Sequence, residues 1–182
     1  MKLILHDLSG GLPENMISEV DRVIPAIGPK APCVGCFGCW VKTPSSCVLR
    51  DRIGDMADYL ADCSELLIVS KTYVGGLAPD TKNLIDRSIG YVLPFMRTLK
   101  LPDENGKHRN EQHHMPRYKK AKYKMTLIAY GKDEFTQEER KLIQEYIKAV
   151  SINFDGMEPV VYFVKDAYEF LAGGSFIENT VY

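Results

Sequence analysis

Short apolar runs alternate with amphipathic stretches along this chain of 182 residues. Five of the runs are rich in Val, Ile and Leu, which is typical of buried strands. We predict strands over residues 2–6, 22–27, 65–70, 125–131 and 160–164. The third run, Glu-Leu-Leu-Ile-Val-Ser, has the nearly continuous apolar pattern of a parallel strand that is buried on both faces.

The amphipathic stretches between these runs predict helices. Apolar residues recur at helical spacing from Ile53 to Leu60, and Asp51 is the expected cap of that helix. Further helices are predicted to begin at Pro13, at Pro79 and at the Thr136-Gln137-Glu138-Glu139 capping box. Strands that alternate with helices form a parallel sheet covered on both faces, and right-handed crossovers make that sheet doubly wound.

The chain length suits one domain with a full core, so we expect a single α/β domain over residues 1–182. Residues 90–124 do not fit this pattern, because they separate a helix from a strand by far more than the usual few residues. From Arg97 to Lys124 the segment holds nine Lys or Arg against three Asp or Glu. That excess predicts either a solvated excursion or a docking surface, and not a part of the core.

The composition is that of an ordinary globular protein, with 45% hydrophobic residues, 26% charged residues and a net charge of −1. This balance gives no indication of binding to nucleic acid or to a membrane surface. No apolar run approaches the roughly 20 residues of a membrane span, and the one after Met1 is too short for a signal peptide. We therefore expect a cytoplasmic protein whose five cysteines stay reduced.

Three glycine-bearing loops follow predicted strands and are expected at one edge of the sheet. They are Asp7 to Gly11, Thr72 to Gly76, and Tyr130-Gly131. Open parallel sheets bind ligands outside the carboxyl ends of their strands, and glycine lets the backbone approach a ligand closely. The first loop is expected to run into a helix N-terminus, which is an anion site. Together the loops predict a site for a flat, phosphorylated ligand.

The least random stretch is Cys33-Val34-Gly35-Cys36-Phe37-Gly38-Cys39-Trp40, which is followed by Cys47. Cysteines in C-x₂-C-x₂-C spacing are typical of 4Fe–4S ligation. A compact set of four thiolates is also a ligand set for zinc. In the third interpretation, reduced cysteines pack as small hydrophobes beside a ligand site. The residues alone leave all three open.

Several other residues have an ordinary structural interpretation. Trp40 is either a wall of a ligand site or packing, and Cys63 is expected to be structural. Adjacent histidines point in different directions on regular structure, so His113 and His114 are expected at the surface or at a dimer contact. Lys82 and Arg87 are expected to anchor their helix or a partner.

The cysteine loop, with Thr43-Pro44, Cys47-Val48 and Asp51, resembles the NAD(P)H-dependent FMN reductases and iron–sulfur flavoproteins. Residues 72–76 and 82–87 resemble the same group of flavodoxin-like proteins. The resemblance implies a flavodoxin-like doubly wound five-stranded parallel sheet in the order 2-1-3-4-5. It also implies bound FMN, electrons from NAD(P)H or from a redox partner, and a homodimer, for which the segment 90–124 offers a contact.

In that group the first glycine loop holds the FMN phosphate, and the loop after the third strand lies along the isoalloxazine ring. The candidate FMN-binding residues are Ser9, Gly10, Gly11, Asn15, Thr72, Tyr73, Val74, Gly75, Gly76, Tyr130 and Gly131. The candidate metal ligands are Cys33, Cys36, Cys39 and Cys47. The first loop departs from the group, because the usual arginine and threonine are missing and Glu14 adds a negative charge.

The sequence shows no Ser-His-Asp set, no paired carboxylates and no Walker loop, so a cofactor would have to supply the chemistry. The first hypothesis is an FMN-dependent oxidoreductase that passes electrons from reduced nicotinamide or a redox partner to an acceptor. The first alternative is a flavodoxin-like binding or scaffold protein that has lost FMN. The second alternative is an iron–sulfur flavoprotein in electron transfer.

Overall fold

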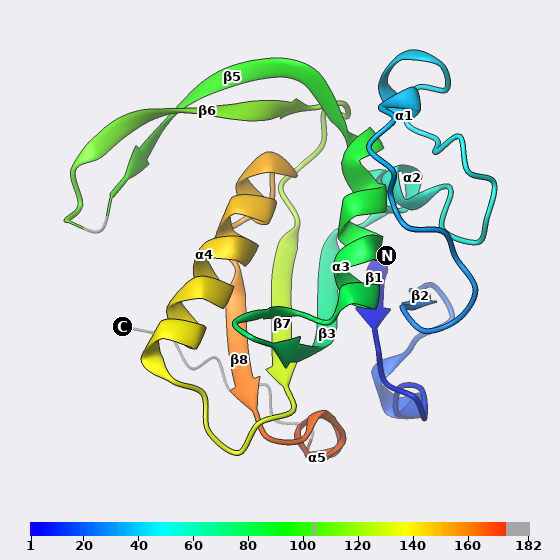
Figure 1. The fold of residues 1–182 in the computed structure, drawn as a ribbon, viewed down its shortest axis with the longest axis vertical. Coiled ribbons are helices and arrows are strands. Elements are labelled where there is room, and N and C mark those ends of the chain that lie inside the picture. Colours follow the sequence, from blue (N-terminus) through cyan, green and yellow to red (C-terminus); the bar gives the residue numbers. More distant parts are fainter. Residues whose placement is uncertain (104, 174–182) are drawn as a thin grey trace.

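The computed structural model describes residues 1–103 and 105–173. Its centre is a sheet of five parallel strands in the spatial order β2-β1-β3-β7-β8 (Figure 1). The strands are β1 (Lys2–His6), β2 (Arg22–Pro25), β3 (Glu65–Tyr73), β7 (Lys124–Tyr130) and β8 (Val160–Val164). All five were predicted from their apolar runs, and their order is the predicted 2-1-3-4-5.

The sheet has one more strand than predicted. The short strand β4 (Gly76–Leu77) pairs antiparallel with the end of β3, where Thr72 lies opposite Leu77. The turn between the two strands consists of Val74 and Gly75, with φ of 48° and 75°. Positive φ at both central residues is what a two-residue hairpin of type I′ requires. The segment expected as an open loop is therefore a tight hairpin.

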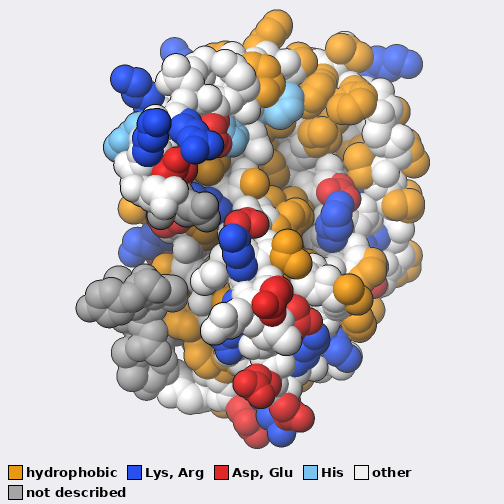
Figure 2. Space-filling view, turned by 60° about the vertical axis from the view of Figure 1, so that its left-hand side comes forward, with side chains coloured by type: hydrophobic (Ala, Val, Ile, Leu, Met, Phe, Trp, Pro, Cys, Tyr) orange, Lys and Arg blue, Asp and Glu red, His pale blue; other side chains and the backbone are white. Residues whose placement is uncertain are grey.

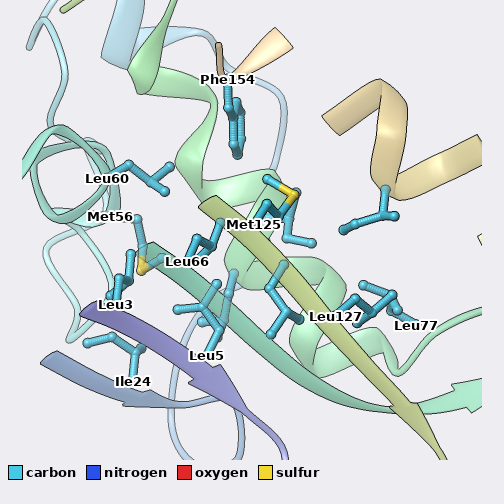
Figure 3. Packing of buried hydrophobic residues seen from close by; sticks show 14 of the residues in the cluster. Leu3, Leu5, Ile24, Met56, Leu60, Leu66, Leu77, Met125, Leu127 and Phe154 are labelled. Carbon is cyan, nitrogen blue, oxygen red and sulfur yellow. The ribbon is translucent and has the colours of Figure 1, made fainter. Parts of the chain in front are cut away.

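Helices α2 (Met56–Asp62), α3 (Pro79–Arg87) and α4 (Gln137–Asn153) pack against one face of the sheet. The strands contribute alternate residues to this core, as Figure 3 shows for Leu3, Leu5, Leu66, Met125 and Leu127. Helix α4 begins at the predicted capping box, because Thr136 accepts from the amide of Glu139 and Glu139 accepts from the amide of Thr136. The helix cap predicted at Asp51 is wrong, because α2 begins after Asp55.

The other face of the sheet is covered by fewer helical residues. Ile4, Leu67, Val69 and Ile128 pack there with helix α5 (Ala167–Ala172). The helix expected after Pro13 is only a 3₁₀ turn, η1 (Glu14–Met16). Its apolar residues are not used as a helical face, because Ile17 and Val20 are 41% and 72% exposed. This turn takes the place of the expected helix in the connection between β1 and β2.

Residues 90–124 form a feature that the sequence did not predict. Strands β5 (Val92–Pro102) and β6 (His108–Pro116) pair as a long antiparallel hairpin, which we call the arm. Figure 1 shows the arm arching over the end of the molecule opposite α5. An ion pair of 2.9 Å between Arg97 and Asp155 and a hydrogen bond from the amide of His114 to Asn153 hold it against the end of α4.

Two shorter helical segments complete the described elements. They are α1 (Gly38–Val41), within the cysteine loop, and η2 (Ser88–Tyr91), which continues from α3. Within the described residues, no helix is long and apolar enough to cross a membrane.

Candidate functional site

The three predicted ligand loops meet at the carboxyl edge of the sheet, around the side chain of Asp7. One oxygen of Asp7 accepts from the hydroxyl of Tyr130 at 3.0 Å. The other accepts from the amide of Lys71 at 2.9 Å and from the hydroxyl of Ser70 at 3.4 Å. Thr72 donates its hydroxyl to the carbonyl of Tyr130 at 3.2 Å. The ends of β1, β3 and β7 are thus joined by polar contacts at the place where such sheets bind ligands.

The environment of this edge shifts two ionisable groups. Burial, together with the charge of Asp7 and its hydrogen bond, raises the pKa of Tyr130 well above its usual value. The hydroxyl therefore stays protonated and can donate to Asp7. His6 is 4% exposed, and burial lowers its pKa although Asp7 acts in the opposite direction. Its Nδ1 accepts from the amide of Leu8 at 3.2 Å, so the neutral ring is the form that fits.

The first glycine loop is not built as a phosphate cradle. The amide of Gly10 donates to the hydroxyl of Tyr168 on α5 at 2.8 Å, and the amide of Gly11 donates to the carbonyl of Leu8 at 3.2 Å. The expected helix N-terminus is absent, because only the three-residue turn η1 follows the loop. Ser9 is exposed at the start of the loop.

Asn15 is separated from the other candidates. It is exposed and lines a shallow hollow together with Met1, Ser64 and Glu65, at the amino ends of β1 and β3. The ligand loops lie at the opposite ends of these strands. The structure therefore does not bring Asn15 to the carboxyl edge.

The second loop lies closer to α4 than to the first loop. Tyr73 and Val74 are 51% and 96% exposed at the turn between β3 and β4. A Cβ placed on Gly75 would lie 3.1 Å from Leu142 of α4, so this glycine faces the helix. The side chain of Lys71 covers Gly131, where a Cβ would lie 2.9 Å from Lys71 Cγ.

The residues at this edge fit the ring of FMN better than its phosphate. Exposed Tyr73 and the glycine backbone of residues 75–76 offer a surface for a planar group. At the phosphate end, Gly10 and Gly11 already donate their amides within the protein, and exposed Glu14 follows them. As folded, this loop does not fit a phosphate.

The four loop cysteines gather around one hollow of about 60 Å³, which we call the thiol hollow. Cys36 is exposed, Cys33 and Cys47 are half-buried, and Cys39 is 7% exposed. Burial raises the pKa of Cys39, and the nearby thiols, Cys47 first among them, raise it further. Among the described residues, no three His, Cys, Asp or Glu side chains are arranged to hold a metal ion.

Arg87 is one of the residues that line the thiol hollow. Its guanidinium is fully buried and pairs with both oxygens of Asp51 at 2.8 and 2.9 Å. It also donates to the carbonyls of Ala31 and Leu49 at 2.8 and 3.1 Å. The role predicted for Arg87 is therefore confirmed, since it anchors the cysteine loop to α3. Lys82, by contrast, forms only an exposed pair with Asp86.

The thiol hollow lies along the second half of α3, from the level of Asn83, which accepts from the Cys33 amide at 3.0 Å, to Arg87. Arg87 is the last residue of this nine-residue helix, and the helix begins directly after β4. In Figure 1, α1 and the arm lie at the end of the molecule opposite α5. A helix of nine residues spans about 13 Å. The expectation that the cysteines pack beside the ligand site stays a prediction.

Trp40 and Cys63, the remaining candidates from the sequence, have structural roles. Trp40 stacks between Phe37 and His114, with ring centroids 4.7 and 5.4 Å away, and donates to the carbonyl of Ile89 at 3.0 Å. Cys63 is 2% exposed behind α2, as expected of a structural cysteine. The sequence did not indicate Tyr168 or Ser70 as part of the edge. Tyr168 gave no signal, because only folding brings α5 to the first loop.

Comparison with known proteins supports the fold. No family model and no curated protein matches the sequence. Among solved structures, the chain is similar to an FMN-dependent NADH-azoreductase from Bacillus anthracis str. Ames Ancestor, determined in complex with FMN. The TM-score is 0.53 at 14% identity, over 94% of this chain and 92% of that chain. At this identity the similarity establishes a flavodoxin-like α/β fold and nothing beyond the fold.

Proposed function

We propose that this chain is a flavin-dependent oxidoreductase that accepts electrons from reduced nicotinamide or from a redox partner. The observation that carries the proposal is the meeting of three glycine-bearing loops at the carboxyl edge of a flavodoxin-like sheet. The solved azoreductase of the same fold carries FMN and is NADH-dependent. Bound FMN would supply hydride acceptance and onward electron transfer, which none of the side chains at this edge supplies alone.

The residues of this edge would hold the flavin by position and not by charge. Tyr73, Val74 and the backbone of Gly76 would lie against the ring system. Asp7 and Tyr130 keep the ends of β1 and β7 together, so the floor of the site is preorganised. Ser9 and Gly10 would meet the phosphate only after the hydroxyl of Tyr168 has left the Gly10 amide.

A titration of the purified chain with FMN and with riboflavin, followed by flavin fluorescence, tests this proposal. Riboflavin carries the ring without the phosphate, so the pair separates the two halves of the site. We expect saturable binding of both, with an affinity ratio below tenfold because the phosphate adds little. Oxidation of NADH and NADPH by the flavin-loaded chain then tests the electron donor. Failure of both flavins to bind would refute the proposal.

A second candidate is a flavodoxin-like binding or scaffold protein that has lost FMN. The observation that favours it is the use of the Gly10 amide by Tyr168 in a loop that has no helix behind it. This function is distinguished by the same titration, since neither flavin would bind while the chain remains folded by circular dichroism.

A third candidate is an iron–sulfur flavoprotein in electron transfer. Its support is the gathering of four thiols above a buried guanidinium whose Nε has no hydrogen-bond partner among the described residues. A buried cation favours the negative charge of a thiolate-bound cluster. Anaerobically purified chain would then contain iron and labile sulfide, and Cys36→Ser would lose both while Cys63→Ser would keep them. Absence of iron from the wild type refutes this candidate.

We also propose that the arm takes part in self-association. Phe95, Met96 and Met115 are 65%, 48% and 40% exposed on its strands. Figure 2 shows hydrophobic side chains gathered at the upper end of the molecule, where the arm leaves the body. Exposed apolar groups that lie together are typical of an interface. Tyr91, at the start of the segment 90–124, is a core residue at 1% exposure and is not part of this surface.

A further inference from the structure

The thiol hollow has no role in the flavin proposal, because none of the residues of the carboxyl edge lines it. That proposal therefore gives no role to the four thiols that line the hollow. Four reactive side chains of one kind line a cavity whose walls are otherwise largely apolar, with Val34, Phe37 and Ile89 among them. Chemistry at these thiols requires no flavin and does not rest on the proposed function.

The backbone of the loop is shaped to present Cys36. Residues on both sides of it, Gly35 and Phe37, have φ of 64° and 53°. Two left-handed residues so close together curl the chain, and the second is not a glycine, which is an uncommon conformation for a phenylalanine. The next residue must be small, because a Cβ on Gly38 would lie 2.5 Å from a methyl carbon of Val48. The curled loop leaves the Cys36 thiol exposed at the mouth of the hollow.

The four thiols differ in how deeply they are buried. Cys36 is exposed, Cys33 is half-buried, and Cys39 is 7% exposed. Cys47 is half-buried and lies beside Arg87, where its contact and that of Asp51 raise the pKa of the guanidinium against the effect of burial. Cys39 is buried, so a reaction partner cannot reach its thiol from outside. The outer pair, Cys33 and Cys36, is left as the accessible one.

The volume of the hollow limits what can react there. About 60 Å³ is far below the roughly 300–1,000 Å³ of pockets that enclose a small-molecule ligand, so the hollow does not enclose an organic substrate. A reaction partner must therefore present a single atom to Cys36 from outside. Exposed Val34 and Phe37, at 66% and 46%, flank that thiol with apolar surface. Cys33-Val34-Gly35-Cys36 also has the two-residue spacing found in thiol–disulfide oxidoreductases.

We propose that Cys33 and Cys36 form a thiol–disulfide exchange site whose substrate is an accessible disulfide. The thiolate of Cys36 attacks one sulfur of the substrate disulfide, whose S–S bond breaks, and the first substrate thiol leaves with a proton. The thiolate of Cys33 then attacks the Cys36 sulfur of the mixed disulfide and releases the second thiol. The protein gives two electrons and two protons, the substrate disulfide becomes two thiols, and Cys33 and Cys36 end as a disulfide.

The test uses glutathione disulfide as the probe on the full chain, purified anaerobically and reduced. After incubation the protein is denatured, its free thiols are alkylated and counted by mass spectrometry, and the disulfide is mapped by proteolysis. Of the five thiols, three are expected to alkylate, with the disulfide joining Cys33 to Cys36. The only tryptophan, Trp40, follows Cys39 directly, so its fluorescence is expected to change in step with the thiol count.

Three variants separate the roles of the thiols. Cys33→Ser should trap glutathione on Cys36 as a stable mixed disulfide, because the resolving thiol is gone. Cys36→Ser should lose all reaction. Cys63→Ser, the matched control, changes a cysteine that is buried behind α2 and should behave as the wild type. Circular dichroism of each variant establishes that it is folded.

Four results would overturn the proposal. They are five free thiols after oxidation of the wild type, a disulfide that includes Cys39 or Cys47, no mixed disulfide on folded Cys33→Ser, and iron with labile sulfide in freshly purified protein. None of these results depends on whether a flavin binds at the carboxyl edge.

Discussion

Arg87 and Asp51 form a two-pronged ion pair of 2.8 and 2.9 Å that fastens the cysteine loop to the end of α3. The guanidinium is fully buried, while the Asp51 side chain is 23% exposed. Asp51 also accepts from the amides of Ala31 and Ile53, so one carboxylate orders both ends of the loop. Without this pair, Arg87 would no longer be held in the wall of the thiol hollow.

Removing one partner of this pair should strongly destabilise the protein. Asp51→Asn leaves a buried guanidinium without its counter-charge, and such changes cost about 3–5 kcal/mol. Urea unfolding followed by circular dichroism measures the free energy of unfolding. Lys82→Ala, the control, breaks only the exposed pair with Asp86 and should cost about 1 kcal/mol or less. Equal losses in the two variants would contradict this assignment.

The same pair should make stability depend on pH in the acid range. Burial acts to raise the pKa of Asp51, but hydrogen bonds from Arg87 and from two backbone amides outweigh it, and the net pKa is lowered. A carboxyl whose pKa is depressed by folding stabilises the protein above its unfolded pKa of about 3.9 and loses that contribution as the pH falls through the folded value. The difference in unfolding free energy between wild type and Asp51→Asn should therefore be constant near neutrality and shrink below about pH 4. A difference that stays constant from pH 7 to pH 3 would exclude this linkage.

Gly90 should tolerate no side chain. A Cβ there would lie 2.3 Å from the carbonyl oxygen of Ser45 and 3.3 Å from Cβ of Cys39, so Gly90→Ala must push the cysteine loop away from η2. We expect a loss of about 1–3 kcal/mol and faster alkylation of Cys39, measured by urea unfolding and by mass spectrometry. Gly76→Ala is the matched control, because its nearest neighbour lies at 3.6 Å. If both variants unfold alike, the contact between loop and η2 is looser than described.

Tyr168 should limit the affinity for FMN. Tyr168→Phe removes the hydroxyl that occupies the Gly10 amide and leaves this amide free for a phosphate oxygen. A hydrogen bond of this kind is worth about 1 kcal/mol, so FMN should bind about fivefold tighter and riboflavin should not. Fluorescence titration of both flavins measures the ratio. Tyr59→Phe, on α2, is the control, and an equal gain for riboflavin would show that the phosphate is not involved.

A Gly75→Val substitution would not test the flavin site. Gly75 has a φ of 75° and faces Leu142 of α4, so a valine would strain the turn and disturb the helix contact. Weaker binding by that variant would report on folding and not on the flavin ring.

Polar replacement of the exposed apolar side chains of the arm should abolish self-association. Phe95, Met96 and Met115 carry the proposed interface. Replacing all three by serine removes this apolar surface and keeps the contacts of Arg97 and His114 with the body. Light scattering should then give the mass of a monomer where the wild type gives a dimer. A wild type that is already monomeric would refute the arm's role.

The sequence by itself determined the layered fold. Nearly continuous apolar runs such as residues 65–70 become buried parallel strands, and the capping box at Thr136 fixes the start of α4, because both depend on local chemistry and period. The gathering of the three loops at one edge followed from strand direction alone.

Only the tertiary structure decided the details of the two sites. The apolar spacing after Pro13 predicts a helix, but of Met16, Ile17 and Val20 only Met16 is buried in the folded chain, and one 3₁₀ turn forms. Tyr168 lies 158 residues after Gly10, so no local pattern announces their hydrogen bond. Likewise, the cysteine loop was recognisable by its spacing, but its attachment to α3 depends on Arg87 and Asp51, which meet only in the folded chain.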